Sequence, residues 1–287
     1  MKSAASFTLI ELMAASAILS VVLLMMVGMQ DQMSRAWANA NRRSDATREA
    51  AAACRAMALD LSSLILRAQG WDVAKARPTP LMNQGIPFLY YSNGTIPASF
   101  TMPSQAQSNS SYFFALTTRP PSAAGPEDYA IIGYYIASGA WTNANGFVTT
   151  NFNLYRHYVA GSNALEKLSQ WFSVSTNLLS RQASILFTPN SATDEILARN
   201  TCNLRITIYS RTNGNTAGWK NAVTNGLNYQ IVSGGSTAWF SGSKIHVEMS
   251  VYPDDYAQRL SLAQWTTSNN IQRFARSFEF RVDIPRE

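Results

Sequence analysis

The architecture is decided by the stretch Phe7-Thr8-Leu9-Ile10-Glu11-Leu12, which opens an almost unbroken apolar run that extends to Val27. About twenty apolar residues, at a rise of about 1.5 Å each, reach the thickness of a bilayer's hydrocarbon core. The Leu, Ile, Val and Phe residues of the run contribute roughly −5 kcal/mol of insertion free energy. Glu11 lies near the front of the run, where its cost stays below the about 3 kcal/mol of the membrane centre. The sequence therefore predicts a membrane-spanning helix.

Three interpretations of this segment compete. A secretory signal peptide has its charges before the apolar stretch and a small-residue cleavage site after it, whereas here a carboxylate interrupts the stretch itself. A plain single-pass anchor explains the length of the run, but it explains neither Glu11 nor the abrupt change from polar to apolar residues at Phe7. The third interpretation accounts for both features.

The residues from Phe7 to Leu12 resemble the processing and methylation motif of type IV pilins and type II secretion pseudopilins. The resemblance implies that residues 1–6 are a leader, which a membrane-embedded prepilin peptidase cuts off between Ser6 and Phe7. It also implies methylation of the new amine of Phe7. Members of the family usually have glycine before the cut, so Ser6 departs from the pattern and we expect slower cleavage.

Glu11 is a functional candidate on physical grounds as well, because a carboxylate inside a membrane needs a partner. Cleavage would create an amine at Phe7, and a free α-amino group is largely cationic at neutral pH. By the family resemblance, Glu11 is an assembly residue whose partner is the Phe7 amine of a neighbouring subunit. Such a buried pair selects the correct register more than it adds stability.

The resemblance also implies the cellular setting. The chain would cross the bacterial inner (cytoplasmic) membrane once, with the leader inside and the C-terminal body in the periplasm or outside. The positive-inside rule weakly disfavours this orientation, because Arg35, Arg42 and Arg43 follow the run and would lie outside with the body. The implied partners are other pilin or pseudopilin subunits, the prepilin peptidase/methylase and inner-membrane lipid.

A helical stalk is predicted after the membrane segment 7–28. Residues 29–69 are rich in alanine and free of proline, and Gly70 is placed to end a helix. Apolar residues recur there at three- and four-residue spacing and predict a stripe that packs on the body: Cys54, Met57, Leu61, Leu64 and Ala68. We place three charged residues away from this stripe: Arg48, Arg55 and Asp60. Asp31 and Arg35 are spaced for an exposed i,i+4 ion pair.

The rest of the chain, residues 70–287, reads as a β-rich globular domain. Strands are predicted near 87–91, 112–116, 129–137, 153–159, 184–187, 204–210, 229–232, 244–252 and 274–284. Short helices are predicted at 164–172 and 254–265. Strict alternation in the strands near 244–252 and 274–284 indicates antiparallel strands with one face on a core and one face in water. The predicted fold class is α+β, with a long N-terminal helix packed on a largely antiparallel, pilin-like sheet.

Composition excludes several functions. The formal net charge of +6 is spread along the chain without a basic block among aromatic residues, so no nucleic-acid partner is predicted. The two histidines, His157 and His246, fall on predicted strands, where a solvent or hydrogen-bonding role is favoured over a metal. No nucleophile elbow, zinc-binding helix motif or phosphate-binding loop occurs in the sequence, so we expect no catalytic residues, no metal and no cofactor.

Cys54 and Cys202 allow two alternatives. In an oxidising compartment they would form a disulfide between the helix and the later strands. The other alternative is two buried, unpaired thiols. Their separation in sequence does not match metal-ligand spacing.

The main hypothesis is a structural subunit, a minor pseudopilin of a type II secretion-like filament. The stretch Ile131–Ile136, followed by Asn153–Arg156, resembles the paired strands of J-type minor pseudopilins. One alternative is a minor pilin of a type IV pilus with an adhesive or DNA-uptake role. Another is a binding or enzymatic domain that uses the pilin-like segment as a membrane anchor.

Mass spectrometry of the mature N-terminus tests the hypothesis at its first step. Because the motif directs cleavage and methylation, we expect the chain to begin at a methylated Phe7. Recovery of an intact Met1 would defeat the pilin-like interpretation.

Overall fold

The computed structural model describes residues 8–64, 71–72, 77–78, 88–91, 102–103, 106–107, 110–118, 129–142, 148–173, 186–211, 219–221, 226–228 and 244–283. The chain divides into two compact units, Met1–Asp45 and Ala46–Glu287. Among its described residues the first unit is one continuous helix, the front part of α1 (Leu9–Ser62). The second unit contains the rear part of α1 and all the strands.

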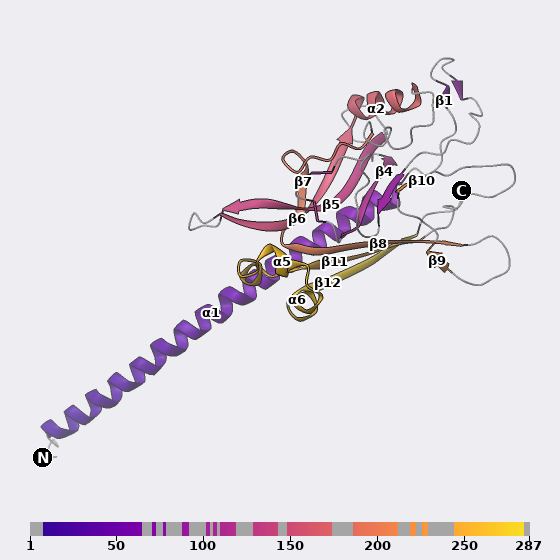
Figure 1. Cartoon of the computed structure of the whole chain (residues 1–287). Helices are drawn as coiled ribbons and strands as arrows, with labels where there is room; N and C mark the ends of the chain where they lie inside the picture. The colour runs from indigo at the N-terminus through magenta and orange to yellow at the C-terminus, as the bar shows by residue number, and fades with distance from the viewer. Residues whose placement is uncertain are drawn as a thin grey trace, which may run out of the picture. The chain divides into compact units, whose positions relative to one another are not determined.

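The second unit is a mixture of helices and antiparallel strands (Figure 1). Its other helices are α2 (Ser162–Ser173), α4 (Asp254–Ala257), α5 (Leu262–Trp265) and α6 (Ser268–Phe274). The strands of a six-stranded sheet, in spatial order, are β10 (Gly226–Asn228), β3 (Phe88–Tyr91), β4 (Tyr112–Thr118), β5 (Tyr129–Thr142), β6 (Val148–Ala160) and β7 (Glu195–Ala198). Those of a four-stranded sheet are β12 (Arg276–Asp283), β11 (Lys244–Val251), β8 (Thr201–Arg211) and β9 (Trp219–Asn221). A separate pair joins β1 (Trp71–Asp72) to β2 (Arg77–Pro78).

The long hairpin β5–β6 forms the centre of the six-stranded sheet. Its register pairs Tyr134 with Arg156 and Tyr135 with Tyr155, so the tyrosine-rich stretch and the later strand lie side by side as expected. Each strand of this sheet pairs with its neighbours in the antiparallel sense. β5 and β6 are joined by the short connection 143–147, which favours an antiparallel pair over a parallel one.

The six-stranded sheet is buried on both faces at its centre. In β4, Phe113 and Ala115 belong to a first core cluster, whereas Tyr112, Phe114 and Leu116 belong to a second. Because successive side chains of a strand point to opposite faces, the continuous apolar run of β4 supplies both clusters. The second cluster is completed by α2 and by the segment at Leu186 and Phe187. The centre of the sheet is therefore a middle layer, and no face of β4 is wet.

The first cluster joins the rear part of α1 to both sheets. The helix contributes Ala50, Ala53, Met57 and Leu61, which are at most 1% exposed. The four-stranded sheet contributes the apolar face of β8 and β11: Leu204, Ile206, Ile208, Ile245, Val247, Met249 and Val251. Small alanine side chains let the helix backbone approach the strands closely, and Met57 and Leu61 fill the space beyond them. The predicted apolar stripe is confirmed in its centre.

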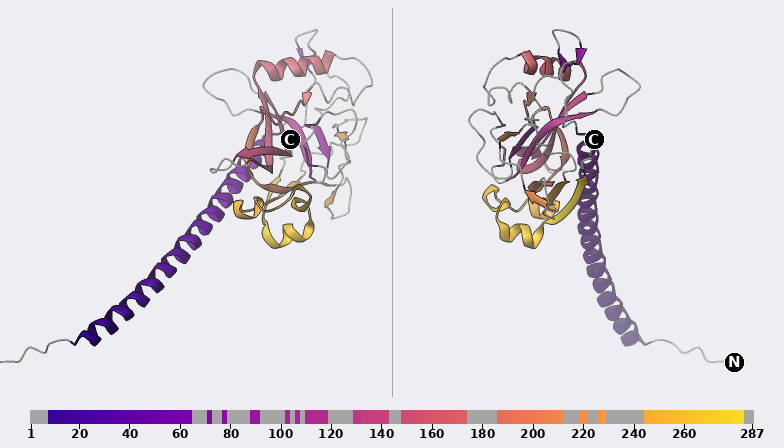
Figure 2. Two further views of the ribbon diagram at one scale, coloured as in Figure 1. Left: turned by 60° about the vertical axis from the view of Figure 1, so that its left-hand side comes forward. Right: turned by 90° about the vertical axis from the view of Figure 1, so that its right-hand side faces the viewer.

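A third, smaller cluster lies under the short helices α4 to α6. It contains Cys202, Tyr252, Ala257 and the fully buried Trp265, against whose ring Tyr252 packs edge-on at 5.3 Å. Figure 2 shows these yellow helices and α2 at opposite ends of the second unit. The predicted single helix over 254–265 is in fact two short helices, with a turn at Gln258 and Arg259 between them.

Most predicted strands are confirmed, at 88–91, 112–118, 129–142, 148–160, 201–211, 244–251 and 276–283. The strand predicted near 229–232 lies outside the described residues. The strand predicted at 184–187 is wrong for its described part, since Leu186 and Phe187 are buried in the second cluster without joining a sheet. β7 was missed, because Glu195-Ile196-Leu197-Ala198 is short and only its last residue is buried.

The helix α1 ends at Ser62, before the expected end near Gln69. Its last turn meets β4, where Leu64 forms a β-bridge with Thr117. Residues 65–70 lie outside the described part of the chain. A tertiary contact with a strand therefore ends the helix before Gly70 is reached.

The pair Phe114 and Gly133 offers a test of how tightly the sheet is packed. They face each other across β4 and β5, and a Cβ added at Gly133 would lie 2.0 Å from the Phe114 ring. Gly133→Ala should lower the free energy of unfolding of the second unit by about 1–3 kcal/mol, because the buried ring has to move. The control is Gly28→Ala, where nothing lies within 4 Å. Chemical denaturation of the full chain in detergent, followed by tryptophan fluorescence, measures both, and equal stabilities would contradict this packing.

Candidate assembly site and the contacts of the body

Glu11 occupies the third position of helix α1 and takes part in a capping box with Thr8. The backbone N–H and the hydroxyl of Thr8 both donate to Glu11 Oε2 at 3.1 Å, and Glu11 N–H donates back to Thr8 Oγ1 at 3.4 Å. This reciprocal arrangement satisfies backbone donors that the first turn of a helix leaves without partners. The carboxylate also lies at the positive end of the helix dipole. Glu11 therefore has a local structural role in addition to any role between subunits.

Ser6 and Phe7, the predicted processing residues, lie outside the described residues. The structure therefore describes only Glu11 of the three residues that the motif brings together. Thr8 was not singled out from the sequence, although the pattern Thr-x-x-Glu ahead of an apolar run is the signal of a capping box.

From Leu12 to Val27, α1 is apolar on all sides. Its large hydrophobic residues from Leu9 to Met33 are each at least 45% exposed, and the helix is long and apolar enough to cross a membrane. A helix that is hydrophobic all round needs an apolar environment, either lipid or other helices. Its serines are satisfied within the helix, because Ser16 donates to the Met13 carbonyl at 2.9 Å and Ser20 to the Ser16 carbonyl at 2.8 Å. This internal pairing is what a membrane segment requires of its polar groups.

Beyond the apolar run, the exposed pair predicted from the spacing is confirmed. Arg35 Nη2 lies 2.9 Å from Asp31 Oδ2, and both side chains are more than half exposed. Such a pair contributes well under about 1 kcal/mol because solvent screens it.

Asp60 fastens α1 to the six-stranded sheet. Arg156 on β6 donates to both carboxylate oxygens at 2.8 Å, from Nε to Oδ2 and from Nη2 to Oδ1, and the Tyr134 hydroxyl donates to Oδ2. The Asp60 side chain is only 14% exposed. Its predicted position away from the packed face is therefore wrong. The prediction used the spacing of apolar residues alone, and that spacing cannot show that Arg156 lies on the strand facing Asp60.

The charges around Asp60 extend further along the sheet. Arg156 Nη1 donates to Glu195 Oε2 on β7 at 3.2 Å, and its guanidinium carbon lies 4.4 Å from the centre of the Tyr158 ring. Burial, followed by the negative charge of Asp60, raises the pKa of Tyr134 well above its ordinary value. The phenol therefore stays protonated and donates its hydrogen bond throughout the physiological pH range.

Three further contacts tie the rear part of α1 to the body. The Thr117 hydroxyl donates to the carbonyls of Asp60 and Ser63 at 3.2 and 3.0 Å, which gives partners to the last turn of the helix. The backbone N–H of Arg199 donates to Glu49 Oε1 at 2.9 Å. Arg276 on β12 donates to the Thr47 hydroxyl at 2.8 Å. Strands of both sheets thus contact the same helix.

His157 belongs to a second buried polar group on the opposite face of the six-stranded sheet. Its Nδ1 lies 2.9 Å from Asp194 Oδ1, while the Tyr135 hydroxyl and the backbone N–H of Asn190 donate to Asp194 Oδ2 at 2.7 and 2.8 Å. Burial, and then the bond to Asp194, raises the pKa of Tyr135. The prediction that His157 faces a hydrogen-bonding neighbour is confirmed. The group holds the loop before β7 against β5 and β6.

Cys54 and Cys202 are free thiols in the structure, which agrees with the second of the two alternatives, that of unpaired cysteines. Cys54 packs against the first core cluster and Cys202 belongs to the third. Burial raises the pKa of Cys54, and it raises the pKa of Cys202 to about 12. Cys202 Sγ donates to the Ser250 carbonyl at 3.2 Å. A neutral, buried thiol is a poor nucleophile, which fits a packing role.

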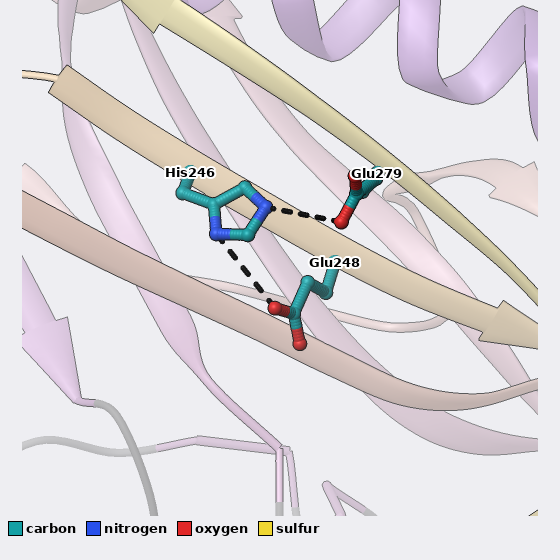
Figure 3. Close-up of side chains that lie close together, drawn as sticks. All are labelled: His246, Glu248 and Glu279. Carbon is teal, nitrogen blue, oxygen red and sulfur yellow. Dashed lines mark ion pairs between the residues drawn. The ribbon is translucent and has the colours of Figure 1, made fainter.

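His246 on β11 lies between two glutamates that the sequence analysis did not connect with it, Glu248 on the same strand and Glu279 on β12 (Figure 3). Residues two apart on a strand share a face, so the spacing of His246 and Glu248 was visible in the sequence. The contribution of Glu279 depends on the pairing register of β11 with β12, which the sequence does not reveal.

The comparisons with known proteins agree with the N-terminal geometry. Residues 1–27 match the family model described as prokaryotic N-terminal methylation motif, which is characteristic of type IV pilins and pseudopilins. No curated protein and no solved structure matches the chain. The chain therefore carries a pilin-type N-terminus on an α+β body, and the motif and the apolar helix together indicate single-pass anchoring in the inner membrane.

The Asp60–Arg156 pair is tested by removing one partner. Arg156→Ala leaves a largely buried carboxylate without its cation, so it should lower the free energy of unfolding by about 2–3 kcal/mol. The matched control is Arg35→Ala, which breaks the exposed ion pair with Asp31 on α1, the helix that also carries Asp60. It should change the free energy of unfolding by less than about 0.5 kcal/mol. Denaturant titration of the full chain in detergent gives both values, and an Arg156→Ala variant as stable as the control would refute the anchoring role.

Proposed function

We propose that the chain is a structural, non-enzymatic subunit, a minor pseudopilin of a type II secretion-like filament. Prepilin peptidase cuts it between Ser6 and Phe7, and the mature chain joins other pilin or pseudopilin subunits through its N-terminal helix. The match of residues 1–27 to the methylation motif supports the processing step. The exposed apolar surface between Leu9 and Met33 supports assembly by helix packing, because that surface needs neighbouring helices once it leaves lipid.

The observation that carries the proposal is the carboxylate of Glu11 within the apolar helix. A capping box stabilises a helix by about 1 kcal/mol, whereas an ionised carboxylate costs more than that inside a membrane. Serine or threonine at position 8 would cap the helix without a charge at position 11. The charge is therefore explained by a cation that arrives from elsewhere, and the Phe7 amine of a neighbouring subunit, created by cleavage, supplies it.

The body supports a role among minor subunits. The β5–β6 hairpin pairs the tyrosine-rich stretch with Asn153–Arg156, as the resemblance to J-type minor pseudopilins implies. Asp60 and the first core cluster hold the sheets on the rear part of α1, so the body and the end of the helix form one packed unit. In this proposal the body lies in the periplasm and contacts other minor subunits. Retention there distinguishes a secretion filament from a surface pilus, where the protein would be found in extracellular fibres.

The assembly role is tested with variants that separate charge from helix capping. Glu11→Gln keeps a side-chain oxygen that can accept the Thr8 hydrogen bonds but removes the charge. Thr8→Ala removes one side of the capping box and keeps the carboxylate. We expect Glu11→Gln to be cleaved and to stay in the membrane but to be lost from filaments, and Thr8→Ala to be incorporated nearly as wild type. Co-purification with the partner subunits after membrane solubilisation, together with mass spectrometry of Phe7, measures both steps.

A result in which Glu11→Gln assembles normally and Thr8→Ala does not would show that capping, not charge, is what Glu11 provides. A further control, Asp31→Ala, removes an exposed carboxylate from the same helix beyond the apolar run and should leave assembly unchanged.

A further inference from the structure

The side chains of His246, Glu248 and Glu279 converge on one face of the four-stranded sheet. β11 and β12 pair antiparallel with Glu248 opposite Glu279 and His246 opposite Arg281. His246 and Glu248 are two residues apart, so they project from the same face, and the direct pairing places Glu279 beside Glu248 on that face. Two glutamates directly opposite each other repel, a repulsion that Arg205, paired with Glu248 on β8, offsets in part.

The distances suit a shared ion. His246 Nε2 lies 3.5 Å from Glu279 Oε2, and His246 Nδ1 lies 3.7 Å from Glu248 Oε1 (Figure 3). One ligand atom from each of the three residues lies within 4.8 Å of the other two. Ligand atoms around a tetrahedral zinc ion are about 3.3 Å apart, given metal–ligand bonds of about 2.0–2.2 Å. Because only one ring nitrogen can bind a given ion, Nε2 would be the ligand beside Glu279, and the Glu248 carboxylate would have to turn from Nδ1 toward that ion.

The histidine supplies an independent observation. His246 is buried, with 9% of its surface exposed, and within the part of the chain that the structure describes its Nε2 has no hydrogen-bond partner. A buried polar atom without a partner costs about 1–3 kcal/mol, so its persistence calls for an unseen ligand. Nε2 points toward the Glu279 carboxylate at a distance too long for a hydrogen bond. Burial of this face of β11 was not expected, because alternation predicted that it would be wet.

We propose that His246, Glu248 and Glu279 bind one divalent transition-metal ion of the zinc class. An imidazole nitrogen with two carboxylates suits zinc and its neighbours, whereas calcium and magnesium take oxygen ligands. This replaces the expectation that no residue of the chain binds a metal. It is independent of the proposed filament role, since none of the three residues belongs to the N-terminal motif.

The ion would act as a clip on the edge of the sheet. β12 is an edge strand, and Glu279 is its ligand, while the other two ligands belong to β11. The Glu279 side chain is 71% exposed, so the remaining coordination position faces solvent and is open to water or to a partner's side chain. Arg205 and Arg281 are exposed and lie in register with Glu248 and His246, and Lys244 lies 3.4 Å from Asp283. These cations offset part of the negative charge of Glu248 and Glu279. The remaining negative charge favours binding of one divalent ion over binding of two.

The experiment titrates zinc ion into the metal-free full chain in detergent by calorimetry at neutral pH. We expect one ion per chain and a rise in the midpoint of thermal unfolding that a chelator reverses. Glu279→Gln and His246→Gln should each weaken binding by more than about tenfold. The matched control is Asp283→Asn, on the same strand and outside the trio, which should bind as wild type.

Glu279→Gln decides the outcome even if His246→Gln fails to fold, because Glu279 is mostly exposed. Binding that survives Glu279→Gln unchanged would overturn the proposal, as would the absence of saturable binding. A site that disappears in Cys54→Ser or Cys202→Ser but not in Glu279→Gln would assign the ion to the thiols and would likewise overturn it.

Discussion

One carboxylate, that of Glu11, is kept within the otherwise apolar run at the front of α1. Every other feature of the run from Leu9 to Val27 favours a hydrocarbon environment, and its serines hydrogen-bond within the helix. Glu11 alone carries charge in that run, and its bonds to Thr8 satisfy the first turn without neutralising it. An ion in low dielectric is tolerated when a counter-ion meets it, and in the proposed assembly the Phe7 amine of a processed neighbour is that counter-ion.

The rear part of the same helix differs, because its apolar and charged side chains find their partners within the chain. Ala50, Ala53, Met57 and Leu61 are covered by two sheets, and Asp60 is neutralised by Arg156 with two short hydrogen bonds. Glu11 and Asp60, both on α1, therefore differ in kind. Asp60 is neutralised within the folded chain, whereas we propose that Glu11 is neutralised by a neighbouring subunit. One helix thus serves as the core of its own body and as the element that joins other subunits.

The sequence predicted those features that repeat or that a motif marks. The sequence predicted the apolar run, the stripe through Met57 and Leu61, and most strands. In each of them apolar residues follow one another or recur at a short, regular spacing. The sequence did not predict the position of Asp60, the end of α1 at Ser62 or the grouping of His246 with Glu279. Each of these depends on a partner far along the chain. The spacing of neighbouring residues does not predict the register in which distant strands pair. The candidate assembly residue was found because a motif marks it, whereas the metal-binding trio has no such signal.

The central claim is that Glu11 of one subunit meets the Phe7 amine of another. Cryo-electron microscopy of the assembled filament, at a resolution that shows side chains, measures that distance directly. The account predicts the Glu11 carboxylate within about 4 Å of a neighbour's N-terminal nitrogen, the range of an ion pair. A carboxylate that faces only Thr8 of its own chain, with the neighbour's amine elsewhere, would contradict it.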